Sequence, residues 1–195
     1  MLLTRIAIAL MGTSILLAAP AGAAEPNLAA MLSNTCAGCH GTNGASMGPS
    51  MPVIAGQPKE YLSETLKKFK NGERPSSIMG RLMKAYSEED IKLMAEFYAS
   101  HPFVRQKQEV DAGKVALGKQ LHNERCKKCH IDNGHDSEDG GILAGQWKQY
   151  LAISLNEFRA SARSMPRKMA EKINGEEPLT PEDIQALVDF YASQQ

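Results

Sequence analysis

Apolar residues recur every three or four positions in several stretches of the chain, a spacing that predicts amphipathic helices. Two of these stretches follow a residue suited to cap a helix, Ser87 in one case and Thr180 in the other, with acidic residues in the next turn. Such residues accept hydrogen bonds from the free N–H groups at a helix start. The apolar faces comprise Ile91, Met94, Ala95 and Tyr98 in the first stretch and Ile184, Leu187, Val188 and Tyr191 in the second.

The same spacing predicts two further pairs of helices in the remaining sequence. These helices are expected at 61–69 and 150–158, and at 28–35 and 113–125. Gly, Pro, Asn and Asp concentrate at 41–56 and at 132–145, which predicts loops there. The sequence therefore predicts an all-α fold.

The second half of the chain repeats the first. The run IAGQPKEYL at 54–62 returns as LAGQWKQYL at 143–151, and the run FYAS at 97–100 returns at 190–193. Duplication of one small helical domain is the simplest explanation, and the proline and polar residues near 101–108 are the expected link. We therefore predict two tandem domains, 25–103 and 104–195, after a separate segment at 1–24.

One short motif occurs once in each half and contains every cysteine of the chain. The two copies are Cys36-Ala37-Gly38-Cys39-His40 and Cys126-Lys127-Lys128-Cys129-His130. C-x-x-C-H is the attachment pattern of a c-type haem. Each thiol can add to one of the two vinyl groups on a porphyrin edge, and the adjacent imidazole can ligate the iron from one face. We therefore predict two covalently bound haem c groups, with His40 and His130 as axial ligands.

Three other uses of paired cysteines fit the sequence less well. A zinc site would place two C-x-x-C pairs roughly 15–20 residues apart, whereas these pairs begin 90 positions apart. A thioredoxin-like redox pair would lie in a βαβ unit, and no strand-like run flanks either motif. Disulfides between neighbouring cysteines would leave the identically placed histidines unexplained.

Residues 1–24 have the pattern of a secretory signal peptide. Arg5 supplies the positive start, 6–19 are apolar, and 20–24 end in small residues ahead of Glu25. The apolar run is short for a membrane-spanning helix, and an uncleaved anchor is the alternative. We expect cleavage before Glu25, a periplasmic location, and no membrane span after the signal is cleaved.

The balance of charges excludes one class of partner. The chain has 22 basic and 22 acidic residues, and removing 1–24, whose one charged residue is Arg5, leaves 21 basic and 22 acidic. A chain so close to neutral is not a strongly basic nucleic-acid binder. The sequence also lacks a G-x-G-x-x-G run opening a βαβ unit, so no dinucleotide fold is expected within it.

The sixth position of each iron has several candidate ligands. A methionine thioether is a soft ligand that raises the reduction potential of a haem. Each half offers two methionines four positions apart, Met79 with Met83 and Met165 with Met169. Counting back from the apolar residue that closes each segment pairs Met79 with Met165, but spacing alone does not choose between the members of a pair. Histidine is the competing ligand type, and the spare histidines are His101, His122 and His135.

The whole mature chain resembles the di-haem cytochrome subunit of flavocytochrome c sulfide dehydrogenase. The stretches that carry this resemblance lie in both halves, at 34–42 (NTCAGCHGT), 78–81 (IMGR), 143–147 (LAGQW), 165–172 (MPRKMAEK) and 190–195 (FYASQQ). The chain is also similar to the di-haem cytochromes of the c-four type, which share the Ala-Gly-Gln turn. The resemblance implies two tandem class I cytochrome c domains. Since Met165-Pro166 resembles the dipeptide that often carries the axial ligand in class I cytochromes, Met165 and, by the repeat, Met79 are the predicted ligands.

The resemblance also implies a function. In that family the haem subunit binds an FAD-containing flavoprotein subunit in the periplasm, and sulfide is oxidised at the flavin. This chain is therefore expected to accept electrons from a flavoprotein sulfide dehydrogenase subunit and to pass them to a soluble cytochrome or a similar acceptor. FAD is expected on the partner, and the chain is not expected to be catalytic alone. The alternative is a free di-haem electron shuttle to a terminal oxidase.

Overall fold

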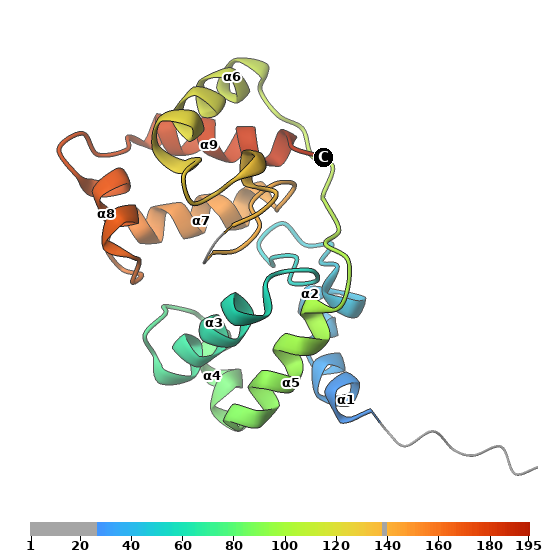
Figure 1. Cartoon of the computed structure of the whole chain (residues 1–195). Coiled ribbons are helices and arrows are strands. Elements are labelled where there is room, and N and C mark those ends of the chain that lie inside the picture. Colours follow the sequence, from blue (N-terminus) through green and yellow to red (C-terminus); the bar gives the residue numbers. More distant parts are fainter. Residues whose placement is uncertain (1–26, 138–139) are drawn as a thin grey trace, which may run out of the picture.

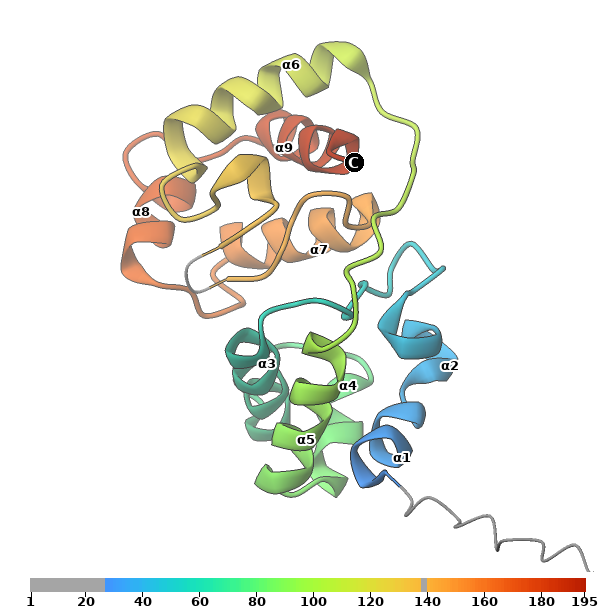
Figure 2. The ribbon, with the colours of Figure 1, turned by 45° about the vertical axis from the view of Figure 1, so that its right-hand side comes forward.

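The computed structural model describes residues 27–137 and 140–195, which form helices joined by loops. The predicted signal peptide at 1–24 lies outside the described residues. Within the two described ranges no residue belongs to a strand, so the prediction of an all-α fold is confirmed. Figures 1 and 2 show two groups of helices, one from each half of the chain, joined by a single extended segment.

The first half is built around α5, which α1 and α3 both contact. Its α-helices are α1 (Leu28–Asn34), α2 (Ala37–His40), α3 (Lys59–Asn71), α4 (Met79–Leu82) and α5 (Glu88–Ala99), with short 3₁₀ turns η1 (Thr42–Gly44) and η2 (Met83–Ala85). α5 begins with a capping box, in which the Asp90 N–H donates to Ser87 Oγ at 3.1 Å and the Ser87 N–H donates to the Asp90 carboxylate at 2.8 Å. These bonds satisfy N–H groups that would otherwise lack partners at the helix start.

The second half repeats this arrangement around α9. Its elements are α6 (Ala112–Leu121), the π-helical turn η3 (His122–Cys126), the 3₁₀ turn η4 (Asp132–Gly134), α7 (Lys148–Arg159), α8 (Arg167–Asn174) and α9 (Pro181–Ser193). α9 begins with the same capping box, formed here by Thr180 and Asp183. The helix predicted at 113–125 therefore exists, but its last turn widens into a π-helix that ends at Cys126, the first residue of the second haem motif. The short helices α2, α4 and α8 are additional to the predicted set.

A tight turn after each motif shows how closely the halves correspond. Gly44 has φ of 83° and Gly134 has φ of 89°. Each carbonyl accepts from two N–H groups, those of the alanine of the Ala-Gly-Gln turn and of the residue before it. A Cβ atom at these positions would lie 2.8 Å from the ring of Tyr98 and 2.9 Å from the ring of Tyr191. Glycine is therefore required by both the backbone conformation and the space.

The two halves contact each other through reciprocal hydrogen bonds. Gln57 Oε1 accepts from the Ile142 N–H at 2.8 Å, and Gln146 Oε1 accepts from the Val53 N–H at 2.9 Å. Each glutamine Nε2 also donates to the carbonyl of the same residue, at 3.3 Å and 2.9 Å respectively. Since these residues occupy matching positions in the repeat, the contact has approximate two-fold symmetry.

The segment between α5 and α6 lies along the second half. Residues 102–111 contain no regular secondary structure. The Gln106 N–H donates to the Gly145 carbonyl at 2.7 Å, and Gln108 Oε1 accepts from the Lys148 N–H at 2.8 Å. The boundary predicted between 103 and 104 falls inside this segment.

No helix in the described part of the chain combines the length and the apolar character needed to cross a bilayer.

The second half has the more continuous core. Phe190, which faces α6, is 1% exposed, whereas its counterpart Phe97 is only half-buried because the shorter α1 covers less of α5. α6 lies so close to α9 that a Cβ at Gly118 would be 2.1 Å from the Ala186 carbonyl oxygen. The close packing of these two helices therefore depends on glycine at position 118.

We predict that Gly118→Ala destabilises the second half, because the added methyl group must push α6 away from α9. Overpacking of this kind costs about 1–3 kcal/mol of unfolding free energy. Gly113→Ala in the same helix is the matched control, since its Cβ would meet only the Asp111 side chain at 3.2 Å and alanine favours the helix by up to about 1 kcal/mol. Denaturant unfolding of the haem-loaded proteins, followed by circular dichroism, measures both. Equal stabilities would contradict the close-packing account.

Candidate functional site

The two C-x-x-C-H motifs have the same backbone geometry. In each, the N–H groups of the second cysteine and of the histidine donate to the carbonyl of the first cysteine, at 3.2 Å and 3.0 Å. Each motif is thus one helical turn, and residues three and four positions apart in a turn lie on the same face. The turn therefore presents two thiols and one imidazole together, as attachment to a single porphyrin requires.

No disulfide joins any of the four cysteines. The second cysteine of each motif, Cys39 or Cys129, is exposed, whereas the first, Cys36 or Cys126, is half-buried at the edge of the apolar core. Burial raises the pKa of the Cys126 thiol. Each motif thus offers one thiol beside the core and one at the surface.

The imidazole of His40 is held in the form that can ligate a metal. The side chain is buried, and Nδ1 lies 2.9 Å from the Pro52 carbonyl oxygen. A carbonyl only accepts, so Nδ1 carries the proton and Nε2 keeps its lone pair. Burial lowers the pKa of His40, which keeps the ring neutral near pH 7. These are the tautomer and charge of an iron ligand.

His130 is half-buried, whereas His40 is buried, and the two also differ in their hydrogen bonds. Burial lowers the pKa of His130 to about 4, so its ring is also neutral near pH 7. Its buried Nδ1 has no hydrogen-bond partner among the described residues. The two motifs therefore agree in backbone and differ in the environment of the ligand histidine.

The two methionines of the first half have different surroundings. Met83 is 1% exposed and packs with Ile91 and Met94, so its sulfur is enclosed by apolar side chains. Met79, the first residue of α4, is only partly buried and lies against the same cluster as Cys36. Met83 thus lies inside the apolar core, whereas Met79 lies at its margin together with the haem motif.

Burial does not separate the two methionines of the second half. Met165 comes directly before Pro166, the N-cap of α8, and Met169 lies inside that helix. Both are partly buried, and both pack, as Cys126 does, against the core around Phe190. The structure thus brings both candidates to the same core as the second motif.

Each spare histidine already has a partner for Nδ1 within the chain. His101 Nδ1 is 2.7 Å from the Phe97 carbonyl oxygen, and His122 Nδ1 is 3.0 Å from the Tyr191 hydroxyl. His135 Nδ1 lies 2.8 Å from a guanidinium nitrogen of Arg105. His122 is fully buried in the second half, where the first half has a leucine at the matching position.

A buried arginine supplies positive charge at the contact between the halves. Arg74 is 7% exposed, its guanidinium lies 4.5 Å from the centre of the Phe69 ring, and Nη2 donates to the Tyr150 hydroxyl at 3.1 Å. Its Nε has no hydrogen-bond partner, and no carboxylate of the described residues forms an ion pair with Arg74. A buried cation is costly without a counter-charge. The carboxylates of a haem would supply this counter-charge. The thiols, imidazoles, thioethers and positive charge of the residues described above therefore fit a haem.

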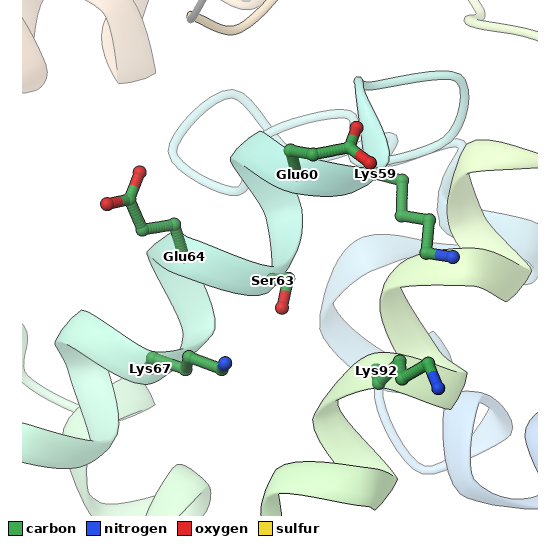
Figure 3. A pocket seen from close by; sticks show the side chains of 6 residues that line it. All are labelled: Lys59, Glu60, Ser63, Glu64, Lys67 and Lys92. Atoms are coloured by element: carbon green, nitrogen blue, oxygen red, sulfur yellow. The ribbon is translucent and has the colours of Figure 1, made fainter.

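A surface pocket lies apart from all of these residues. It measures about 340 Å³ and lies between α3 and α5, lined by Lys59, Glu60, Ser63, Glu64, Lys67 and Lys92 (Figure 3). Lys59 is paired with Glu96 at 2.9 Å and Lys67 with Glu88 at 3.1 Å. Since these ammonium groups already have carboxylate partners, the pocket has no strong charge to offer a ligand.

Comparisons with known proteins match both halves. The cytochrome c family model matches residues 28–101 and 115–195. The chain is 47% identical over 70 residues to the cytochrome subunit of sulfide dehydrogenase of Chlorobaculum tepidum, covering 36% of this chain and 63% of that relative, less than two thirds of its length. It is 31% identical over 146 residues to cytochrome c4 of Azotobacter vinelandii, covering 66% and 70% of the two chains.

A solved structure has the same two-domain arrangement. The crystal structure of reduced recombinant cytochrome c4 from Pseudomonas stutzeri matches with a TM-score of 0.76 and 24% identity, over 89% of this chain and 100% of that one. At this identity the match establishes the fold, with two cytochrome c domains in tandem. The chain therefore belongs to the cytochrome c family, and it is a di-haem electron-transfer protein with two covalently bound haem c groups.

Proposed function

We propose a specific ligand set for the two haems. The thioether bonds use Cys36 and Cys39 in the first half and Cys126 and Cys129 in the second, and the axial pairs are His40 with Met79 and His130 with Met165. The common helical turn of the two motifs and the neutral state of both histidines support the cysteine and histidine assignments. The enclosed position of Met83 supports Met79.

The surroundings of these residues suit electron transfer. When bound, each haem supplies an iron that gains and loses one electron. A thioether ligand stabilises the ferrous state, whereas a hydrogen bond from the histidine Nδ1 strengthens the imidazole as a donor and favours the ferric state. The apolar residues around Met79 and Met165 limit the access of water to the sulfur atoms. The protein thus sets the reduction potentials through ligand type, hydrogen bonding and burial.

We further propose that the chain is the haem subunit of a periplasmic sulfide dehydrogenase. It would accept electrons from an FAD-containing flavoprotein subunit and pass them to a soluble cytochrome or a similar acceptor. The observation that carries this proposal is the 47% identity over 70 residues to a protein named as the cytochrome subunit of sulfide dehydrogenase. The signal-like pattern of 1–24 supports export.

A free electron shuttle to a terminal oxidase is the second candidate. The longer match to cytochrome c4, which extends over 146 residues and both halves, favours it. The two candidates share the same haems and domains. They differ in whether the chain has a permanent flavoprotein partner.

We predict that Met79→Leu abolishes the near-infrared thioether-to-iron charge-transfer band of the first haem and lowers its reduction potential, because leucine keeps the volume but removes the sulfur. Met83→Leu is the matched control. A conservative swap in the core costs less than about 1.5 kcal/mol and should leave the band intact. Optical spectra of the oxidised variants measure the band. Its loss in Met83→Leu and retention in Met79→Leu would reverse the assignment.

The same comparison in the second half uses Met165→Leu and Met169→Leu. We expect Met165→Leu to remove the band of the second haem and Met169→Leu to keep it, because the Met165 assignment follows the Met-Pro dipeptide. Recording both variants in a Met79→Leu background leaves only one band to follow. A band that survives in Met165→Leu and disappears in Met169→Leu would assign the ligand to α8.

Purification of the protein from its native source tests the partner. We expect a flavin to co-purify in a stable complex, and added sulfide to bleach the flavin before the haem is reduced, since the electrons enter through the partner. The order of these two absorbance changes is measured by stopped flow. A haem-only protein that sulfide does not reduce would support the free shuttle instead.

A further inference from the structure

One peptide group connects the ligand histidine of the first half to the second half. The Pro52 carbonyl accepts from His40 Nδ1 at 2.9 Å, and the Val53 N–H donates to Gln146 Oε1, also at 2.9 Å. The carbonyl and the N–H belong to the same planar amide. A continuous hydrogen-bonded path thus runs from the imidazole of one half to a side chain of the other.

The Gln146 amide is fixed in the orientation that this path requires. The side chain is 1% exposed, and its Nε2 donates to the Val53 carbonyl at 2.9 Å. Its Oε1 accepts a second hydrogen bond, from the Trp147 N–H at 3.1 Å. Exchanging the amide O and N would place donors against N–H groups and the oxygen against a carbonyl. The bonding partners therefore determine that Oε1 faces the Val53 N–H.

The second half holds the whole loop that carries this peptide. Trp147 Nε1 donates to the Ser46 carbonyl at 3.1 Å, and the Tyr150 N–H donates to the Pro49 carbonyl at 3.1 Å. Together with Gln146, these residues contact the loop from Ser46 to Val53 at three places along its length. The position of the acceptor for His40 is thus set in part from outside its own domain.

Hydrogen bonds in a chain polarise one another, and a buried site strengthens the effect. Donation by the Val53 N–H to Gln146 makes the Pro52 carbonyl a stronger acceptor for the His40 N–H. A stronger bond at Nδ1 gives the imidazole more anionic character and raises its basicity as a ligand. That change favours ferric iron and lowers the reduction potential.

We propose that Gln146 is a positioning residue through which the second domain lowers the reduction potential of the first haem. The inference rests on the proposed ligation by His40. Gln146 acts through the Pro52–Val53 peptide and does not contact the imidazole of His40.

The matching residue Gln57 provides an internal control. It is 4% exposed and forms the same pair of hydrogen bonds, to the N–H and carbonyl of Ile142. However, no described residue accepts from His130 Nδ1, so the Gly141–Ile142 peptide does not continue the path to a ligand. Gln57 Nε2 also donates to the Val53 carbonyl at 3.4 Å, but that carbonyl belongs to the Val53–Ile54 peptide. Gln57 therefore shares the interfacial role of Gln146 and does not bond to the Pro52–Val53 amide that connects to His40.

The test compares Gln146→Met with Gln57→Met in the haem-loaded protein. Each variant loses two interfacial hydrogen bonds at nearly constant side-chain volume. We expect Gln146→Met to raise one of the two reduction potentials. At a fixed applied potential, the ratio of oxidised to reduced protein at that haem should fall roughly three- to tenfold. A tenfold change corresponds to about 59 mV for one electron. Gln57→Met should change this ratio less than threefold for either haem. Spectroelectrochemical titration measures these values.

Nuclear magnetic resonance of the reduced protein provides the second readout. The His40 Nδ1–H resonance should move upfield in Gln146→Met, as expected for a weaker hydrogen bond, and stay in place in Gln57→Met. Gln146→Glu keeps an oxygen acceptor for the Val53 N–H, so its potential should not rise. This variant also provides a second test if Gln146→Met folds poorly.

Equal shifts in Gln146→Met and Gln57→Met, or a potential in Gln146→Glu that rises as in Gln146→Met, would overturn the inference while leaving the ligand set intact. A wild-type spectrum in which His40 lacks the ring-current shift of a haem ligand would instead overturn the proposed ligation, and the inference with it. The two failures are thus distinguishable.

Discussion

Each haem motif must present two thiols and one imidazole to the same porphyrin, and this requirement shapes the rest of the structure. A single helical turn meets it, because residues three and four positions apart share a face. The first cysteine of each turn lies against the core, while the second lies at the surface. A methionine that served as the sixth ligand would have to come from the later part of the same half. In each half, the first cysteine of the motif and the candidate methionines lie against the same apolar cluster.

The contact between the halves does more than join two copies of a domain. The paired glutamines form a symmetric set of hydrogen bonds, but the two ligand histidines next to this contact differ. In the first half His40 is hydrogen-bonded to the Pro52 carbonyl, whereas in the second half His130 Nδ1 has no such bond among the described residues. Arg74 and Tyr150 come from different halves and meet at the same contact. Duplication thus produced a symmetric frame, and differences at a few buried positions make the two haem environments unequal.

Much of the fold follows from local patterns in the sequence. The caps at Ser87 and Thr180 mark the starts of α5 and α9, and the repeated Ala-Gly-Gln run identifies the two domains. The motifs identify the cysteine and histidine positions because their chemistry depends on spacing within five residues. These features are predictable because the interactions that form them are close in sequence.

Other features depend on contacts between distant residues, and no local pattern signals them. Two examples are the π-helical turn His122–Cys126 and the packing of Gly118 in α6 against Ala186 in α9. The repeat singles out Gln57 and Gln146 as matching residues, but only the fold shows that each binds the other half. Burial separates Met79 from Met83, yet both Met165 and Met169 lie half-buried beside one core, so neither sequence nor burial alone decides that ligand.

The central claim is that two haem c groups are bonded to this chain, one in each repeat. Mass spectrometry of the exported protein under denaturing conditions tests it most directly, because only covalently bound haem remains attached. The account predicts a mass equal to the signal-cleaved polypeptide plus two haems, falling by one haem when Cys126 and Cys129 are replaced by serine. A mass equal to that of the bare polypeptide, after maturation in a host that attaches haem c, would contradict it.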